Sequence, residues 1–181
     1  MKSPTLRTER LLLRAYERSD VPALLPLIGA REVAATTLRI PHPYKEEDAE
    51  VLFTPSEENV RLAVTLQAEQ RLIGGIGLRL DSPHNRAELG YWIGFPYWGR
   101  GYATEAAQAV VRYGFEILNL HRIYAEHFGN NPSSGRVLRK LGMKPEGYLP
   151  QHILKWGEYL DVAVYGMLRT DFKAKWGCSP L

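Results

Sequence analysis

A short loop with two glycines, set between a predicted strand and a long amphipathic helix, constrains this chain most. Residues 87–93 alternate as a strand does, residues 94–102 form the loop, and apolar side chains recur at helical spacing over residues 103–118. Gly99 and Gly101 can turn backbone N–H groups inward without a Cβ in the way. The start of a helix adds unpaired N–H groups and the positive end of its dipole. The segment therefore predicts a pyrophosphate cradle, or a glycine turn that merely joins strand to helix.

Two common nucleotide motifs do not fit this loop. A P-loop needs a lysine and a serine or threonine after its last glycine, whereas Tyr102 and Ala103 follow here. The dinucleotide fingerprint needs three glycines at another spacing, early in a βαβ unit. Arg100 adds a positive charge between the two glycines of the loop. The residues alone thus leave both the phosphate cradle and the plain glycine turn open, and they do not name a ligand.

The composition is that of an ordinary globular protein. The chain has 181 residues, 45% hydrophobic and 24% charged, with no internal repeat or linker, which predicts a single domain over residues 1–181. It has no apolar run near the roughly 20 residues of a membrane span, and its polar beginning does not resemble a signal peptide, so we expect a cytoplasmic protein without a membrane partner. The net charge of +3 suits either nucleic acid or a polyphosphate ligand, but no dense basic tract supports nucleic acid.

Cysteine and histidine give no sign of a metal or a covalent centre. Cys178 is the only cysteine and lies near the end of the chain, where it is interpreted as incidental. The five histidines share no metal-ligand spacing, so no metal site is predicted.

The order of predicted elements indicates an α/β or α+β protein with a mixed central sheet. Runs of strands and alternating units both occur. The expected strands cover residues 11–14, 62–66, 72–78, 87–93, 123–128, 144–156 and 158–168, and the expected helices cover 24–28, 45–53, 103–118 and 132–141.

Four separated segments resemble the GNAT superfamily of acetyl-CoA-dependent N-acetyltransferases, in particular its RimJ/RimL-like branch. Residues 98–103 are similar to the phosphate motif Gln/Arg-x-x-Gly-x-Gly/Ala, with Trp98 in the first position as in that branch. The segments 8–14, 131–143 and 146–161 resemble its first strand, its Asn-x-x-Ser helix and its closing hairpin. The resemblance implies a mixed, mostly antiparallel central sheet of about seven strands flanked by helices, with a splay between the fourth and fifth strands.

The resemblance also implies the cofactor, acetyl-CoA, and the residues that bind it. The end of the fourth strand would offer free backbone groups to the pantetheine amides, and Asn131 would cap a helix and contact the pantetheine arm. The implied cofactor-binding residues are Trp92, Ile93, Trp98, Gly99, Arg100, Gly101, Tyr102, Ala103, Thr104, Asn131 and Ser134.

Two residues are candidates for proton transfer. Glu88 occupies the strand position where several GNAT enzymes hold a general base; the alternatives are a water network, or a solvent-facing carboxylate paired with Arg79 or Arg86. The resemblance makes Ser134 the candidate general acid, because Leu138 stands where many relatives have a tyrosine. The alternatives are a bound water as the acid, or a Ser134 hydroxyl that only satisfies N–H groups of the helix's first turn.

The expected function is direct acetyl transfer to a primary amine. The acceptor is left open among a protein N-terminal amine, which the branch suggests, and small amines such as an aminoglycoside or a polyamine. A non-catalytic acyl-CoA sensor and a nucleic-acid-binding domain are the other hypotheses, and a homodimer is left open.

Overall fold

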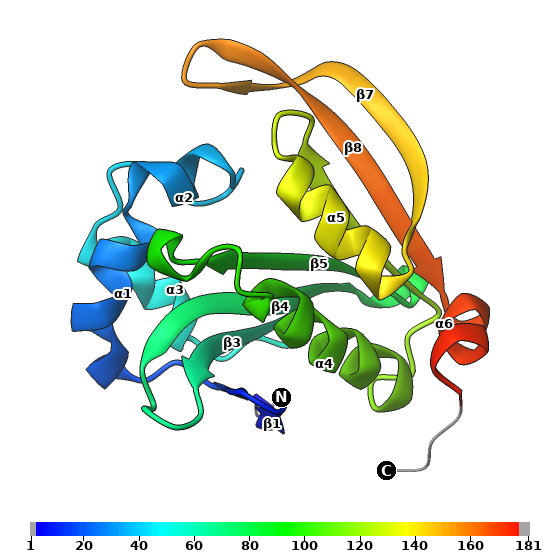
Figure 1. The fold of residues 1–181 in the computed structure, drawn as a ribbon, viewed down its shortest axis with the longest axis horizontal. Coiled ribbons are helices and arrows are strands. Elements are labelled where there is room, and N and C mark those ends of the chain that lie inside the picture. Colours follow the sequence, from blue (N-terminus) through cyan, green and yellow to red (C-terminus); the bar gives the residue numbers. More distant parts are fainter. Residues whose placement is uncertain (1–2, 178–181) are drawn as a thin grey trace.

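The computed structural model describes residues 3–177 and contains one mixed sheet in the order β1-β2-β3-β4-β5-β6-β8-β7 (Figure 1). Neighbouring strands are antiparallel except β5 and β6, which are parallel. The strands are β1 (Leu6–Arg7), β2 (Leu11–Arg14), β3 (Asn59–Leu66), β4 (Leu72–Asp81), β5 (Arg86–Ile93), β6 (Arg122–Phe128), β7 (Lys144–Lys155) and β8 (Glu158–Leu168). The helices are α1 (Val21–Ile28), α2 (Arg31–Ala35), α3 (Glu46–Phe53), α4 (Tyr102–Glu116), α5 (Pro132–Leu141) and α6 (Arg169–Trp176).

The predicted fold class is confirmed, with eight strands in the sheet instead of about seven. The additional strand, β1, is two residues long and pairs with β2, Leu6 opposite Leu13 and Arg7 opposite Leu12. Such a short segment has no periodicity that a sequence pattern could reveal.

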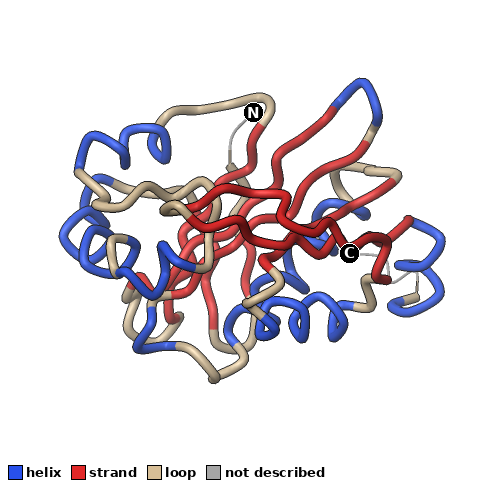
Figure 2. The backbone as a smooth tube through the Cα atoms, turned by 90° about the horizontal axis from the view of Figure 1, so that it is seen from above, coloured by secondary structure: helices blue, strands red, loops and turns tan. Residues whose placement is uncertain are grey.

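Helices cover both faces of the sheet. In Figure 2 the strands run through the centre and the helices lie around the periphery. One core cluster joins the sheet to α4, α5 and α6, and a second joins it to α1, α2 and α3. Along β5, Leu89 and Ile93 belong to the first cluster and Trp92 belongs to the second. Alternate residues of β5 therefore serve opposite faces.

The splay lies between β5 and β6. The two strands pair only where residues 86–88 face residues 122–124. Beyond that point β5 continues to Ile93 and β6 to Phe128 without pairing to each other. The predicted opening between the fourth and fifth expected strands is thus confirmed, and it leaves two strand edges facing a gap.

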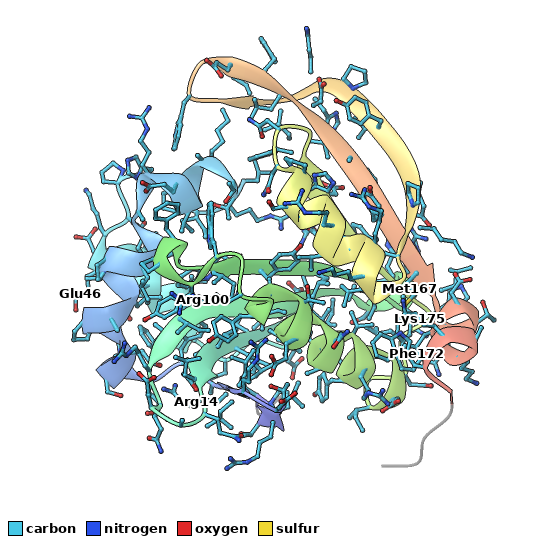
Figure 3. The ribbon with its side chains drawn as sticks, viewed as in Figure 1. Arg14, Glu46, Arg100, Met167, Phe172 and Lys175 are labelled. Atoms are coloured by element: carbon cyan, nitrogen blue, oxygen red, sulfur yellow. The ribbon has the colours of Figure 1, made fainter. Side chains whose placement is uncertain are left out.

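Two helices have no counterpart in the sequence predictions. Helix α2 is five residues long, and α6 buries Phe172 against the core beside Met167, where it stacks on Phe115 at 4.9 Å between ring centroids (Figure 3). Both are too short or too polar to show a helical apolar pattern. Cys178 lies outside the described residues. Within residues 3–177, no helix is both long and apolar enough to span a membrane.

Candidate active site

The loop before α4 forms a cradle of backbone donors. Gly99 and Gly101 have φ values of +75° and +83°, a left-handed conformation that residues with a Cβ rarely adopt. Gly101 occupies the N-cap position with no side-chain cap, and the backbone N–H of Glu105 donates to its carbonyl. The N–H groups of the helix's first turn therefore have no intrahelical partner. A Cβ at Gly99 would meet no atom within 4 Å, so the space in front of the loop is open.

The beginning of the chain holds this loop in place. Glu105 of α4 accepts hydrogen bonds from the Thr8 hydroxyl at 2.6 Å and from Arg10 Nε at 2.7 Å. Arg10 also donates to the carbonyl of Arg100 at 3.1 Å and lies over the Tyr102 ring at 4.6 Å. Burial raises the pKa of Glu105, but the hydrogen bonds from Thr8 and Arg10 outweigh it and leave the pKa below its usual value. We call this group, Thr8, Arg10 and Glu105, the loop clasp.

A cavity of about 640 Å³ occupies the splay and reaches both faces of the sheet. All the predicted site residues line it except Arg100. The Arg100 guanidinium lies 5.9 Å from the centroid of the Tyr97 ring, and the residue sits on the loop before α4 (Figure 3). Trp98 lines the cavity and also donates its indole N–H to the carbonyl of Ile93 at 2.5 Å, which joins the loop to the end of β5.

Ser134 lies at the start of α5 and shares a hydrogen bond of 2.7 Å with the phenol of Tyr91. The side chain of Asn131 accepts from the Ser134 N–H at 3.3 Å, which confirms the predicted N-cap. Burial raises the pKa of Tyr91 to about 12, although the hydrogen bond with Ser134 acts in the opposite sense. The phenol is therefore neutral at physiological pH and can hold the Ser134 hydroxyl in one orientation. Leu138 is buried in the core, away from any polar role.

Glu88 lies on the opposite face of β5 from Tyr91 and is only 8% exposed. Arg39 donates to its two oxygens at 2.8 and 2.9 Å, and Arg79 donates at 2.5 Å. Burial raises the pKa of this carboxyl, but hydrogen bonds from Arg39 and Arg79 outweigh it and hold the pKa below its usual range. The alternative of a solvent-facing carboxylate is wrong, although pairing with Arg79 was correctly expected. Arg86 pairs with Asp81 instead.

The β7–β8 hairpin arches over α5 towards α2 (Figure 1). Lys155 donates to the carbonyl of Thr37 at 2.5 Å, and the ring of Trp156 lies 5.5 Å from that of His42. Ile153 of the hairpin lines the cavity. The hairpin thus joins the segment after α2 to the wall of the splay.

Three cavity residues were missed by the sequence predictions. Tyr91 and Arg39 belong to the site because they bond to Ser134 and Glu88, and a single sequence does not reveal such contacts between distant residues. His127 donates from Nδ1 to the Phe128 carbonyl at 2.8 Å, and the residue lines the cavity. Its Nε2 is buried next to Gly135 of α5 and has no hydrogen-bond partner among the described residues.

The comparisons with known proteins decide the family. The sequence profile described as "Acetyltransferase (GNAT) domain" matches residues 10–144. The chain belongs to the GNAT acetyltransferases. This acyltransferase is 34% identical over 170 residues to the uncharacterized N-acetyltransferase YnaD of Bacillus subtilis, covering 92% of this chain and 98% of YnaD.

Two further relatives of this GNAT protein have named acceptors. The [ribosomal protein uS5]-alanine N-acetyltransferase of Escherichia coli is 34% identical over 84 residues, covering 46% of this chain and 43% of that protein. The solved structure of spermidine N-acetyltransferase from Vibrio cholerae, in complex with CoA and spermine, has a TM-score of 0.80 and 28% identity, covering 91% and 99% of the two chains. The RimJ/RimL-like resemblance is thus confirmed, with both ribosomal-protein and polyamine enzymes among the relatives.

Proposed function

We propose that this GNAT protein transfers an acetyl group from acetyl-CoA directly to a primary amine within the cavity of the splay. The observation that carries the proposal is the continuity of that cavity. It joins the backbone cradle at residues 99–104 to the Ser134–Tyr91 pair on one face of the sheet and to Glu88 on the other. One ligand can therefore bind its phosphates at the cradle and present its acyl end between the two faces.

The residues of the cavity fit coenzyme A. The free N–H groups at the start of α4 suit a pyrophosphate, and the unpaired edge of β5 at Trp92 and Ile93 suits the amides of pantetheine. Asn131 and Ser134 add polar side chains to the opposite wall. Acetyl-CoA supplies the thioester acyl group and a thiol leaving group. The relative from Vibrio cholerae, solved with CoA, supports this assignment.

In the proposed reaction the amine nitrogen forms a bond to the acyl carbon and the carbon–sulfur bond breaks. Ser134 gives a proton to the departing sulfur while Tyr91 holds the hydroxyl in place. Glu88, which stays ionised because of its arginine partners, takes up the proton that the amine loses, directly or through a water molecule. Residues 3–177 contain no cysteine, which favours direct transfer over an acyl-cysteine intermediate.

For the acceptor, we propose a protein N-terminal amine first and a small amine, such as a polyamine or an aminoglycoside, as the alternative. The E. coli relative is named for the N-acetylation of an alanine of ribosomal protein uS5, whereas the V. cholerae relative is named for spermidine. An N-terminal amine has a pKa of about 8, so a useful fraction is neutral near physiological pH and a weak base such as Glu88 suffices.

The experiment is to follow CoA release by the purified protein with N-terminal peptides, spermidine and an aminoglycoside. We expect turnover with at least one of them and a large loss in Ser134→Ala, while acetyl-CoA binding is kept. Tight binding of acetyl-CoA with no turnover on any acceptor would contradict the proposed enzyme activity and favour a sensor of acyl-CoA.

A further inference from the structure

The part of the cavity on the Glu88 face of β5 is rich in positive charge. Among the described residues, two carboxylates lie there against four cationic groups. The charged side chains that line this part, or that bond to a residue lining it, are Arg39, Arg61, Arg79, Lys155, Glu88 and Glu126. We call this part the acceptor chamber. The four charged side chains that line the chamber, Arg39, Arg61, Glu88 and Glu126, balance one another. Arg79 and Lys155, which bond to the lining residues Glu88 and Thr37, bring the net charge of the chamber and its immediate surroundings to +2.

The one buried carboxylate of the chamber is not free to bind a cation. Both Glu88 oxygens accept hydrogen bonds from Arg39, and Arg79 donates to one of them as well. Glu88 and its two partners together bear a net charge of +1. An ammonium group that approached Glu88 would also approach two guanidinium groups. Two like charges about 4 Å apart repel by about 4 kcal/mol near a protein surface and by about 1 kcal/mol in bulk water.

The arginines keep donors for another anion. A guanidinium has five N–H donors, and those of Arg39 bonded to Glu88 are only two of them. The side chain of Arg39 is 57% exposed and lines the cavity, so its remaining donors can be reached from the chamber. Arg61 lines the same chamber and uses one N–H on the Val51 carbonyl, at 3.2 Å. A carboxylate can be bound by such planar donors in a bidentate manner.

We infer that the acceptor is a primary amine whose own molecule carries a carboxylate or another anionic group, bound by Arg39 and Arg61, and that it is not a polyamine. The inference rests on the proposed function, because it assumes that the chamber receives an amine. The anion can belong to a free amino acid or short peptide, or to an acidic side chain near a protein N-terminus. Both sources share the same chemistry.

The same positive charge assists the reaction. Nearby cations disfavour the ammonium form of the acceptor and so increase the fraction of neutral, nucleophilic amine. The effect acts on the reacting amine of a polyamine as well, but the additional ammonium groups of a polyamine would each have to approach like charges. Recognition of an anion and activation of the amine are thus served by the same arginines.

The test uses pairs of acceptors that differ only in charge. One pair is glycylglycine and glycylglycinamide; the other is the amidated peptides alanyl-aspartyl-alanine and alanyl-asparaginyl-alanine, with the lysyl peptide and spermidine as cationic acceptors. We expect kcat/KM at least about tenfold higher for the acidic member of the preferred pair, as for a hydrogen bond to a charged group. Which pair shows the larger ratio distinguishes a free amino-acid source from an acidic N-terminus.

In the variants Arg39→Gln and Arg61→Gln, the ratio of kcat/KM for the acidic acceptor to kcat/KM for the neutral acceptor should fall close to one. Arg61→Gln leaves the partners of Glu88 untouched and therefore separates anion binding from any effect on Glu88. Arg86→Gln is the matched control, because Arg86 pairs with Asp81 and does not line the cavity. It should keep the wild-type ratio.

A second readout does not depend on turnover. The N-acetylated forms of the same peptides are added to the CoA-loaded protein, and their affinities are measured by calorimetry. Tighter binding of the acidic form supports the inference. Equal affinities and equal kcat/KM for acidic and neutral acceptors, or a preference for spermidine, would overturn it while leaving the proposed transferase intact. If no acceptor is turned over, the proposed function fails, and the affinities of the acetylated peptides alone decide whether the chamber binds an anion.

Discussion

The substitution Gly101→Glu tests the phosphate cradle most directly. Its first effect is conformational, because a residue with a Cβ at φ +83° loses about 1–2 kcal/mol of folding free energy. Its second effect is electrostatic. A carboxylate about 5 Å from a phosphate oxygen, at an effective dielectric constant of 20, is repelled by roughly 3 kcal/mol, which weakens the binding of acetyl-CoA about a hundredfold.

Two control variants separate these effects. Gly101→Ala carries the same backbone strain without the charge, and its Cβ would lie 3.5 Å from Arg10 Nη2, an ordinary contact. Gly157→Glu adds the same charge at a φ of +85°, on the turn between β7 and β8, where a Cβ would meet no atom within 4 Å. We expect both to keep an acetyl-CoA Kd within about tenfold of wild type, as measured by calorimetry, with thermal unfolding as the check on folding. An equal loss in Gly157→Glu, or unchanged binding in a folded Gly101→Glu, would refute the assignment of the cradle.

Three further predictions concern the rest of the site. Ser134→Ala should lower kcat about a hundredfold or more, with little change in the KM for acetyl-CoA. Adding Tyr91→Phe to Ser134→Ala should lower kcat little further, because the phenol acts through the serine. Fully additive losses of kcat in steady-state kinetics would show that the phenol does not act through the serine. Glu88 has a lowered pKa in the folded state, so its contribution to stability is present above its ordinary pKa of 4.5 and is lost as the pH falls through its pKa in the folded state. The free energies of unfolding of wild type and Glu88→Gln should therefore converge in acid. A difference between them that stays constant from pH 7 to pH 3 would argue against a carboxylate stabilised by its partners. Arg10→Gln removes part of the loop clasp, including the contact with Glu105, and should weaken acetyl-CoA binding up to about tenfold, whereas an unchanged affinity would limit the clasp to a role in folding.

The sequence predicted the parts of the site that are local along the chain. The cradle depends on residues 99–104, and the strand before it and the helix after it carry clear periodicities. The helix cap formed by Asn131 is also local, because its side chain accepts from the N–H of Ser134, three residues later. The splay was expected from the family resemblance and is seen in the strand pairing.

What the sequence did not predict depends on contacts between distant segments. Arg39 lies in the irregular segment after α2, and its pairing with Glu88 joins residues that are 49 positions apart. The burial of Glu88 was left open, because a strand residue between apolar neighbours has no local sign of the two guanidinium groups that bond to it. Arg100 was expected in the site as a positive charge, yet its guanidinium lies 5.9 Å from the centroid of the Tyr97 ring and the residue is not part of the cavity wall.

The splay has a mechanical consequence for the whole molecule. Strands β1–β5 and strands β6–β8 form two parts of one sheet that pair with each other at only three positions, and the core under α4 and α5 is what otherwise joins them. A ligand seated in the gap would contact both parts and add a further connection between them. Loading the protein with cofactor should therefore do more than add binding energy: it should slow the exchange of amide hydrogens along the facing edges of β5 and β6, where the two strands are not paired with each other.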